Sequence, residues 1–258
     1  MSDVATARGQ RFLDRDFRWR GTDVSRMEAF ADAVFALVLA LLFLRATPPE
    51  NIGELKATMK GLLPFVVTFV LLAMVWVDHH RFFRRYGLVD KTTFFGNLAL
   101  LFLVLFYAYP LKFLFTLLSV MWFGPIGTLD ATSMTAGQEA GDPHRMMLFY
   151  GSGFGAIYLT FVLLYWHAFR RADDLGLDEV ERHATITSML ECLVLVGFAL
   201  LSLGFVALDQ PATSGLVYFG IGPCMALLGW RRGAAQRVLV RARGAGRDDT
   251  ARPAAPAI

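Results

Sequence analysis

Charged residues are scarce in this 258-residue chain: they make up 18% of it, whereas 55% of the residues are hydrophobic. A soluble domain of this length carries more charge and alternates its apolar residues with polar ones. Here the apolar residues form long blocks, and a helix needs about 20 of them to cross the hydrocarbon core of a bilayer. The composition therefore excludes an ordinary soluble protein and predicts an all-α integral membrane protein.

Cysteine is almost absent, and no secretory signal precedes the first apolar block. Cys192 and Cys224 both lie inside apolar blocks, so they offer neither a disulfide framework nor metal-ligand spacing and are expected to be small core residues. Residues 1–25 carry arginines throughout, without an apolar stretch before a cleavage site. The first block is therefore expected to stay in the protein and to act as its own insertion signal.

Six apolar blocks predict six transmembrane helices, because lipid admits only helices or closed barrels and these blocks do not alternate. The blocks cover residues 27–44, 62–77, about 93–118, about 146–169, about 186–208 and about 213–230. This pattern divides the chain into three parts: a basic N-terminal segment, a transmembrane domain and a tail, which cover residues 1–25, 26–232 and 233–258. The tail begins with arginines that suit an anionic lipid surface and ends in Ala, Pro and Gly, so it is expected to be largely disordered.

The basic residues between the blocks predict the orientation. Twenty of them fall in the segments on one side of the membrane and four on the other. Positively charged loops stay in the cytoplasm, so both termini are expected there, in a multi-pass protein of the plasma membrane.

The first block carries charges at its start and a leucine stripe further along. Successive helical residues turn by about 100°, so Arg26 and Phe30 share a face. Asp32 points about 140° away from Leu37, and charges within a span usually face a bundle interior or a water cavity. The stripe, with Ala33 and Ala40 on the same side, is spaced i, i+4, i+7: Leu37, Leu41 and Leu44.

These residues carry a resemblance to a known family. Arg26, Phe30, Ala31 and Asp32 resemble the Arg-x-x-x-Phe-Ser-Asp signature of the lysosomal potassium channel family, transmembrane protein 175, in its bacterial branch, although Ala31 replaces the serine and removes its hydroxyl. Three further landmarks agree: "WVDHHRFFRR" at the end of the second block, Asn97 early in the third, and Pro110 later in it. The similarity covers residues 26–232.

The resemblance implies a potassium channel made of four copies, whose first helices line a central pore without the TVGYG carbonyl filter. It places the constriction at Leu37, Leu41 and Leu44, which coincide with the stripe derived from spacing. A leucine ring cannot replace the hydration shell of an ion, so passage requires partial dehydration and the ring can close by dewetting. No cofactor, metal or nucleic acid is expected; the partners are K+ ions, the bilayer and further copies of the chain.

In this interpretation Arg26 and Asp32 hold the first helix rather than touch ions. Their expected partners come from the second and third blocks: His79, His80 and Asn97. A metal site at Asp78, His79 and His80 is disfavoured, because adjacent helical residues point about 100° apart. A titrating histidine near the cytoplasmic mouth offers a possible source of pH sensitivity.

Two other motifs leave alternatives open. "YGSGFG", residues 150–155, looks like a carbonyl filter, but it opens a span without a preceding pore helix. Its glycines at 151 and 155 fit a close contact between two helices instead.

Two other functions compete with a channel: a membrane-embedded enzyme that uses the histidine-rich end of the second block, and a secondary transporter. The spans carry few polar residues and show no repeat, which disfavours both.

Overall fold

Six long helices and two short ones form the described part of the computed structural model, residues 17–43, 51–124 and 143–250. No strand occurs in these ranges. The helices are α2 (Arg26–Phe43), α3 (Ile52–Tyr86), α4 (Lys91–Phe123), α6 (Pro143–Arg170), α7 (Glu179–Ala207), α8 (Pro211–Leu216), the 3-10 helix η1 (Val217–Gly220) and α9 (Ile221–Thr250).

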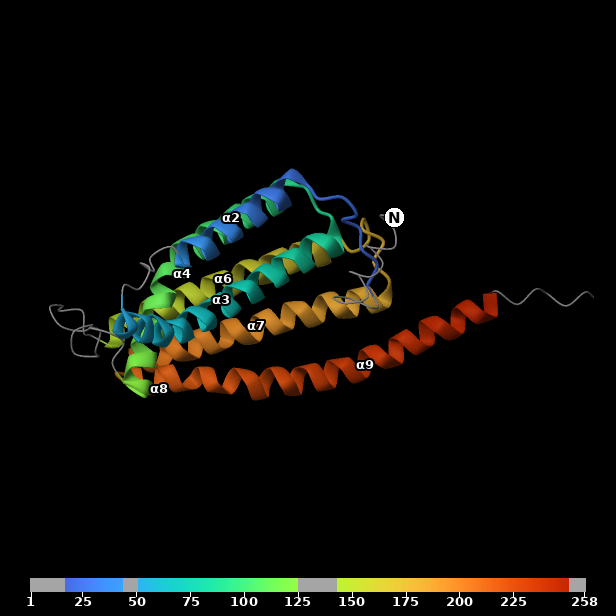
Figure 1. Cartoon of the computed structure of the whole chain (residues 1–258). Coiled ribbons are helices and arrows are strands. Elements are labelled where there is room, and N and C mark those ends of the chain that lie inside the picture. The colour runs from blue at the N-terminus through green and yellow to red at the C-terminus, as the bar shows by residue number, and fades with distance from the viewer. Residues whose placement is uncertain (1–16, 44–50, 125–142, 251–258) are drawn as a thin grey trace, which may run out of the picture.

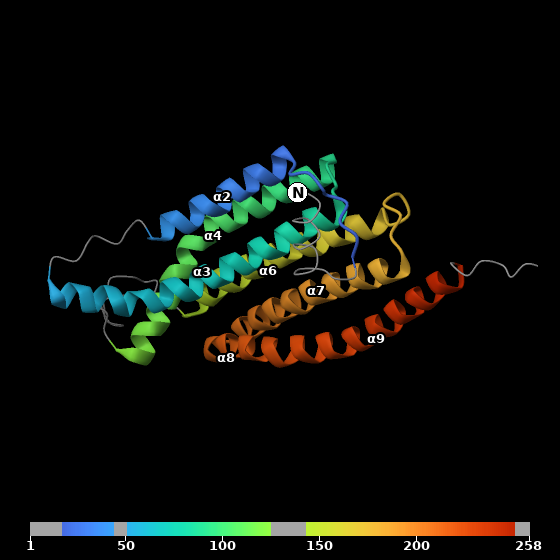
Figure 2. The same ribbon diagram turned by 45° about the vertical axis from the view of Figure 1, so that its right-hand side comes forward.

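The long helices lie side by side along one direction (Figure 1). α2 packs against α3 and α4 on one side of the bundle, and α6 and α7 form its most extensive helix pair. On the opposite side α9 packs against α7 and extends beyond it (Figure 2). The start of α2, the end of α3 and the loop between α6 and α7 meet at one end of the bundle, where the sequence is basic.

Side-chain caps fix where the helices begin at this basic end. The backbone N–H of Glu28 donates to the Ser25 hydroxyl at 3.1 Å, so Ser25 caps α2. Asp90 accepts from the backbone N–H of Thr93 at 2.9 Å and caps α4. α7 begins with a capping box formed by Asp178 and Glu181.

Five helices of the described chain are long and apolar enough to cross a membrane. The candidate spans are Met59–Tyr86, Lys91–Val120, His144–Arg170, Glu179–Ala207 and Pro211–Ala242. α2 is outside this set, and its 18 residues include three charged side chains: Arg26, Glu28 and Asp32. The all-helical fold with multiple apolar helices agrees with the composition, and α2 is shorter than the other long helices, so its charged residues fall within the length that would span the membrane.

Two segments depart from the sequence-based prediction. α3 continues as a helix through Tyr86, so the basic stretch expected to be a loop from residue 79 is helical as far as 86. It stays helical because this stretch has a buried face, on which Phe82 is 0% and Phe83 3% exposed. α9 continues to Thr250, so the tail expected to be disordered is helical over 233–250; its alanines and arginines favour a helix. Residues 251–258 lie outside the described ranges.

An aromatic cluster joins α3, α6 and α7 near the basic end. The ring of Phe82 meets that of Tyr165 at 5.4 Å, and the ring of Tyr86 lies 6.1 Å from Tyr165. The Tyr86 hydroxyl also donates to the Thr185 hydroxyl at 2.8 Å. This buried contact holds the end of α3 against the start of α7, close to the segment that precedes α2.

Candidate pore-lining site

α2 has two unlike faces. One face is uncovered in the protomer: Phe30 is 57%, Leu37 53% and Leu41 49% exposed, and Ala33 and Ala40 on the same side are also exposed. The other face is buried against α3 and α4 and consists of Ala31, Phe35, Val38 and Leu42, each 3% exposed or less. The leucine stripe predicted from spacing therefore lies on the uncovered face as far as Leu41. Leu44 lies outside the described residues.

Asp32 lies between these faces and is hydrogen-bonded to α3. Its carboxylate accepts from the indole N–H of Trp76 at 2.8 Å. The predicted direction, away from the leucines, agrees with this contact, but the partner differs: the sequence suggested His79, His80 or Asn97. Trp76 precedes His80 by one helical turn, and their rings stack with centroids 5.6 Å apart. Because residues four apart share a helix face, the position of Trp76 one turn before His80 was the feature of the sequence that could have indicated it as a partner of Asp32.

His79 and Asn97 form a buried pair between α3 and α4. The imidazole Nε2 donates to the Asn97 side-chain oxygen at 2.7 Å, and the two residues are 0% and 3% exposed. The His79 ring also packs 5.6 Å from Phe35 on the buried face of α2. The structure therefore brings these two predicted residues together behind α2, where they support its buried face rather than its uncovered one.

His80 belongs to a charged cluster that the sequence did not reveal. Glu28, in the first turn of α2 and 3% exposed, lies 3.6 Å from His80 Nδ1 and 3.2 Å from Arg84 Nε. His80 and Arg84 are one turn apart on α3, so both reach the same carboxylate. A buried carboxylate needs such partners, and this cluster fixes the start of α2 on α3.

Arg26 lies on the uncovered face of α2, and among the described residues no hydrogen bond or ion pair to its side chain is found. The pairing expected from the sequence is therefore not observed there. A cavity of about 530 Å³ opens beside it, between the starts of α2 and α4. The lining residues are Ser25, Arg26, Met27, Phe30, Val89, Phe94, Asn97 and Leu98.

Asp90 ties the start of α4 to the end of α6. Its carboxylate lies 2.6 Å from His167 Nε2 and 3.3 Å from an Arg171 nitrogen. Burial raises the pKa of Asp90, but hydrogen bonds from Thr93 and His167 outweigh it and hold the pKa at about 2. The carboxylate therefore stays ionised at physiological pH, the form that accepts the hydrogen bond from the Thr93 N–H at the start of α4.

The glycines of residues 150–155 lie inside α6 and bring it close to its neighbours. A methyl group at Gly155 would meet the Ala199 side chain of α7 at 3.0 Å, and one at Gly151 would meet Leu203 at 3.0 Å. At Gly153 it would meet Tyr107 of α4 at 2.5 Å. This is the close helix contact expected from the spacing of Gly151 and Gly155.

These features define a class: an α-helical membrane protein in which α2 is fastened along one face and uncovered along the other. In the described residues no three side chains of His, Cys, Asp or Glu converge as a metal-ligand set. Comparison with known proteins then identifies the family.

The family described as the endosomal/lysosomal potassium channel TMEM175 matches residues 26–107. A potassium channel of Marivirga tractuosa is 36% identical over 224 residues, which cover 84% of this chain and 91% of the relative. A potassium channel of Streptomyces collinus is 28% identical over 201 residues, covering 75% of this chain and 82% of that one. The fold also matches a crystal structure of a variant of the potassium channel MtTMEM175, with a TM-score of 0.75 at 36% identity, over 85% of this chain and 97% of that one.

The chain belongs to the TMEM175 family of potassium channels. The family predicted from the Arg26–Asp32 motif is thereby confirmed. This membership places the protein among ion channels and not among enzymes, and it favours neither of the alternative functions.

Proposed function

We propose that this protein is a potassium-permeable channel in which four copies surround a central axis and α2 lines the pore. The observation that carries the proposal is the contrast between the two faces of α2. Its leucines at 37 and 41 are about half exposed in the protomer, whereas the opposite face is closed by α3 and α4. Four such faces around one axis would enclose a passage lined by leucine and alanine.

The side chains on this face explain how ions would be restrained. Rings of Leu37 and Leu41, continued by Leu44 beyond the described residues, present no oxygen to replace hydration water. An ion must then pass with part of its shell stripped, and a narrow apolar ring can dewet and close. K+ holds its water less tightly than Na+, so this barrier favours K+ to a moderate degree without a TVGYG carbonyl filter. No cofactor is required.

α2 would be the first of six spans, crossing with its charged residues near the basic end. The basic end, with its arginines on the segment before α2, the end of α3 and the start of α7, suits the cytoplasmic side. Both termini would then be cytoplasmic in a plasma-membrane protein. α2 differs from an ordinary span because its uncovered face would meet water and neighbouring copies.

The test is ion flux through the purified protein in liposomes under a K+ gradient, compared with Na+. Wild-type protein should carry K+ faster than Na+. Leu37→Ala should raise the flux and lower the K+ preference, because it widens the ring. Leu39→Ala, a leucine two residues away that is packed against the core, is the matched control and should keep the wild-type ratio. Absence of flux above empty liposomes, or equal effects of the two variants, would contradict the proposal.

A further inference from the structure

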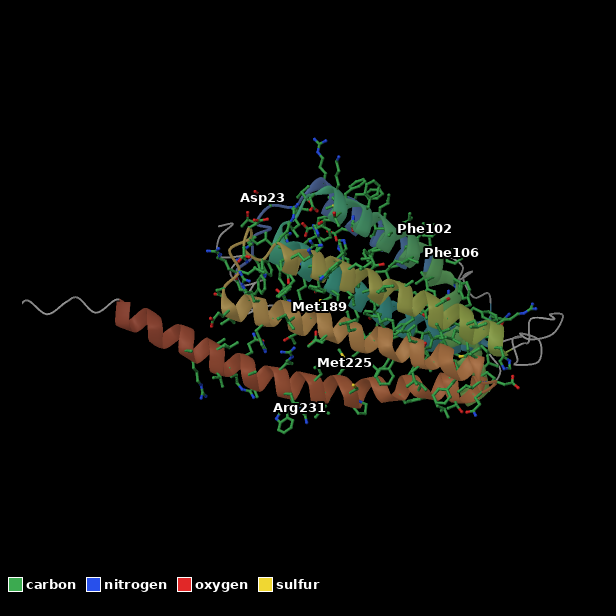
Figure 3. The ribbon with its side chains drawn as sticks, turned by 180° about the vertical axis from the view of Figure 1, so that it is seen from behind. Asp23, Phe102, Phe106, Met189, Met225 and Arg231 are labelled. Atoms are coloured by element: carbon green, nitrogen blue, oxygen red, sulfur yellow. The ribbon has the colours of Figure 1, made fainter. Side chains whose placement is uncertain are left out.

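The segment that precedes α2 is fastened to three other elements of the bundle. Residues 17–25, here called the N-terminal strap, run along the basic end before α2 begins (Figure 3, near Asp23). The backbone N–H groups of Arg20 and Gly21 donate to the carbonyl of Arg84 at 3.1 and 3.2 Å. A methyl group at Gly21 would lie 2.5 Å from the Phe83 carbonyl oxygen, so the strap touches the backbone of α3.

Phe17 anchors the beginning of the strap. Its side chain is 3% exposed and meets the Tyr86 ring edge-on at 5.6 Å. The guanidinium of Arg85 lies 5.0 Å from the Phe17 ring, a cation–π distance. This contact places the strap against the last turn of α3, where Tyr86 also belongs to the aromatic cluster.

Arg20 joins the strap to α7 and to the turn before it. One guanidinium nitrogen lies 2.6 Å from Glu181 Oε2 and a second 3.3 Å from Oε1. The same side chain donates to the carbonyls of Leu175 at 2.7 Å and Gly176 at 3.0 Å. The two side chains are 12% and 3% exposed, so the charge pair is largely withdrawn from water. Glu181 also accepts from the backbone N–H of Arg18 at 2.8 Å.

Arg84 joins the same strap to α2. Its guanidinium donates to the carbonyls of Gly21 and Thr22 at 3.0 and 3.3 Å. Its Nε lies 3.2 Å from Glu28 in the first turn of α2. A continuous series of charged contacts thus runs from Glu181 on α7 through Arg20, the strap and Arg84 to Glu28.

We infer that Arg20 is a positioning residue for the pore helix: through the strap and Arg84 it sets the place of the cytoplasmic end of α2 relative to α7. The inference rests on the proposed function, in which α2 lines the pore. α2 packs directly on α3 and α4, whereas α7 packs mainly on α6 and α9. At this end α7 also reaches α3 through the hydrogen bond from Tyr86 to Thr185, and the strap adds a second link, which runs from Glu181 to the first turn of α2. Movement of α7 would be passed to the ring of leucines through α2.

The experiment compares Arg20→Ala with Arg18→Ala in the full-length protein. Arg18 is a matched control because it is an exposed arginine of the same strap, and its substitution keeps the backbone contact with Glu181. Hydrogen exchange of peptides covering residues 18–30 is measured in detergent, together with K+ and Na+ flux in liposomes. Arg20→Ala should speed exchange in the strap and in the first turn of α2 by at least about tenfold, because the loss of one charged hydrogen bond alone is worth that factor and Arg20 makes several. It should also lower the ratio of K+ to Na+ flux.

Arg18→Ala should leave both measurements at their wild-type values. If Arg20→Ala elutes as the wild type but changes neither the exchange near Glu28 nor the flux ratio, the inference is overturned. If Arg20→Ala does not fold, Arg20→Lys is used in its place. Lysine keeps the charge but lacks the forked guanidinium that reaches the Leu175 and Gly176 carbonyls, so smaller changes in the same direction are expected. Unchanged values for that variant overturn the inference as well.

The two readouts separate this inference from the proposed function. Hydrogen exchange reports the position of α2 whether or not the protein conducts. Faster exchange in Arg20→Ala, together with a wild-type protein that carries no ions, would refute the proposed pore while supporting the strap as a link to α2. A wild-type protein that conducts K+, together with unchanged exchange in Arg20→Ala, would support the proposed pore and refute the strap as a link to α2.

Discussion

The two faces of α2 differ in how far the protomer covers them. The buried face consists of Ala31, Phe35, Val38 and Leu42, and lies against α3 and α4. The uncovered face carries leucine and phenylalanine side chains that are about half exposed, together with exposed alanines, and has no comparable covering within the protomer. Both faces are apolar, so hydrophobicity alone does not distinguish them.

The polar contacts make the distinction. Asp32 accepts a hydrogen bond from Trp76 of α3. Glu28 lies beside His80 and Arg84 of the same helix. In a bilayer the lipid tails are as apolar as a leucine, so apolar packing alone defines the rotation of a helix weakly, and interhelical hydrogen bonds add direction. The charged residues at the start of α2 thus decide which of its two apolar faces is left uncovered in the protomer.

The largest expected effect is on the buried face. Phe35→Ala removes a ring that is 2% exposed and leaves a cavity next to His79. We expect a loss of about 2–3 kcal/mol in unfolding free energy. This is less than in soluble cores, because lipid rather than water surrounds the side chain in the reference state. Denaturation in detergent, followed by circular dichroism, measures it.

Phe30→Ala is the matched control for that variant. Phe30 is 57% exposed on the other face of the same helix, so its truncation should change the stability of a protomer by less than about 0.5 kcal/mol. Equal losses for the two variants would mean that both faces are buried in the assembled protein, and the contrast between them would disappear.

The next effect concerns the buried polar pair behind α2. Asn97→Leu leaves the His79 imidazole without its hydrogen-bond acceptor, and we expect a loss of about 1–2 kcal/mol. The double variant His79→Leu with Asn97→Leu removes both polar groups and should recover most of that loss. Unfolding of the three proteins side by side gives the comparison. If the double variant is no more stable than Asn97→Leu, the unpaired His79 imidazole is not the cause of the loss, and the expectation is wrong.

A smaller effect is expected at Asp32. Asp32→Asn keeps an oxygen that accepts from the Trp76 indole, whereas Asp32→Ala removes it, so the alanine variant should be less stable than the asparagine variant by about 1 kcal/mol. Tryptophan fluorescence and unfolding midpoints of both variants measure this difference. Equal stability of the two would mean that the hydrogen bond does not contribute to holding α2.

The residues of α2 show how much of this site follows from the sequence. A turn of 100° per residue is enough to group Leu37 with Leu41 and to direct Asp32 away from them. The angle does not say which neighbour Asp32 meets, because that depends on how α3 is rotated and how far it slides along α2. Trp76 and the Glu28–Arg84 contact therefore emerged only from the structure.

In the fold, too, some features follow from the sequence and others do not. Apolar blocks predicted where the helices lie, since length and hydropathy are properties of the chain alone. Their ends were not predictable in the same way: Phe82 and Phe83 lie among histidines and arginines, and only packing against neighbouring helices reveals that this basic stretch has a buried side. The N-terminal strap was likewise invisible, because its backbone contacts with Arg84 leave no pattern in the residues.

The smallest expected change in stability, and the sharpest test of the contrast, is on the uncovered face. Leu41→Ala truncates a side chain that is 49% exposed, so the unfolding free energy of the protomer should change by less than about 0.5 kcal/mol. Ion flux in liposomes should nevertheless change, because the same side chain is proposed to narrow the pore. Leu42→Ala, at the adjacent buried position, should show the opposite pattern, with lower stability and a flux per folded channel close to the wild type. If both variants lose stability alike and neither alters flux, α2 has no free face for ions to meet.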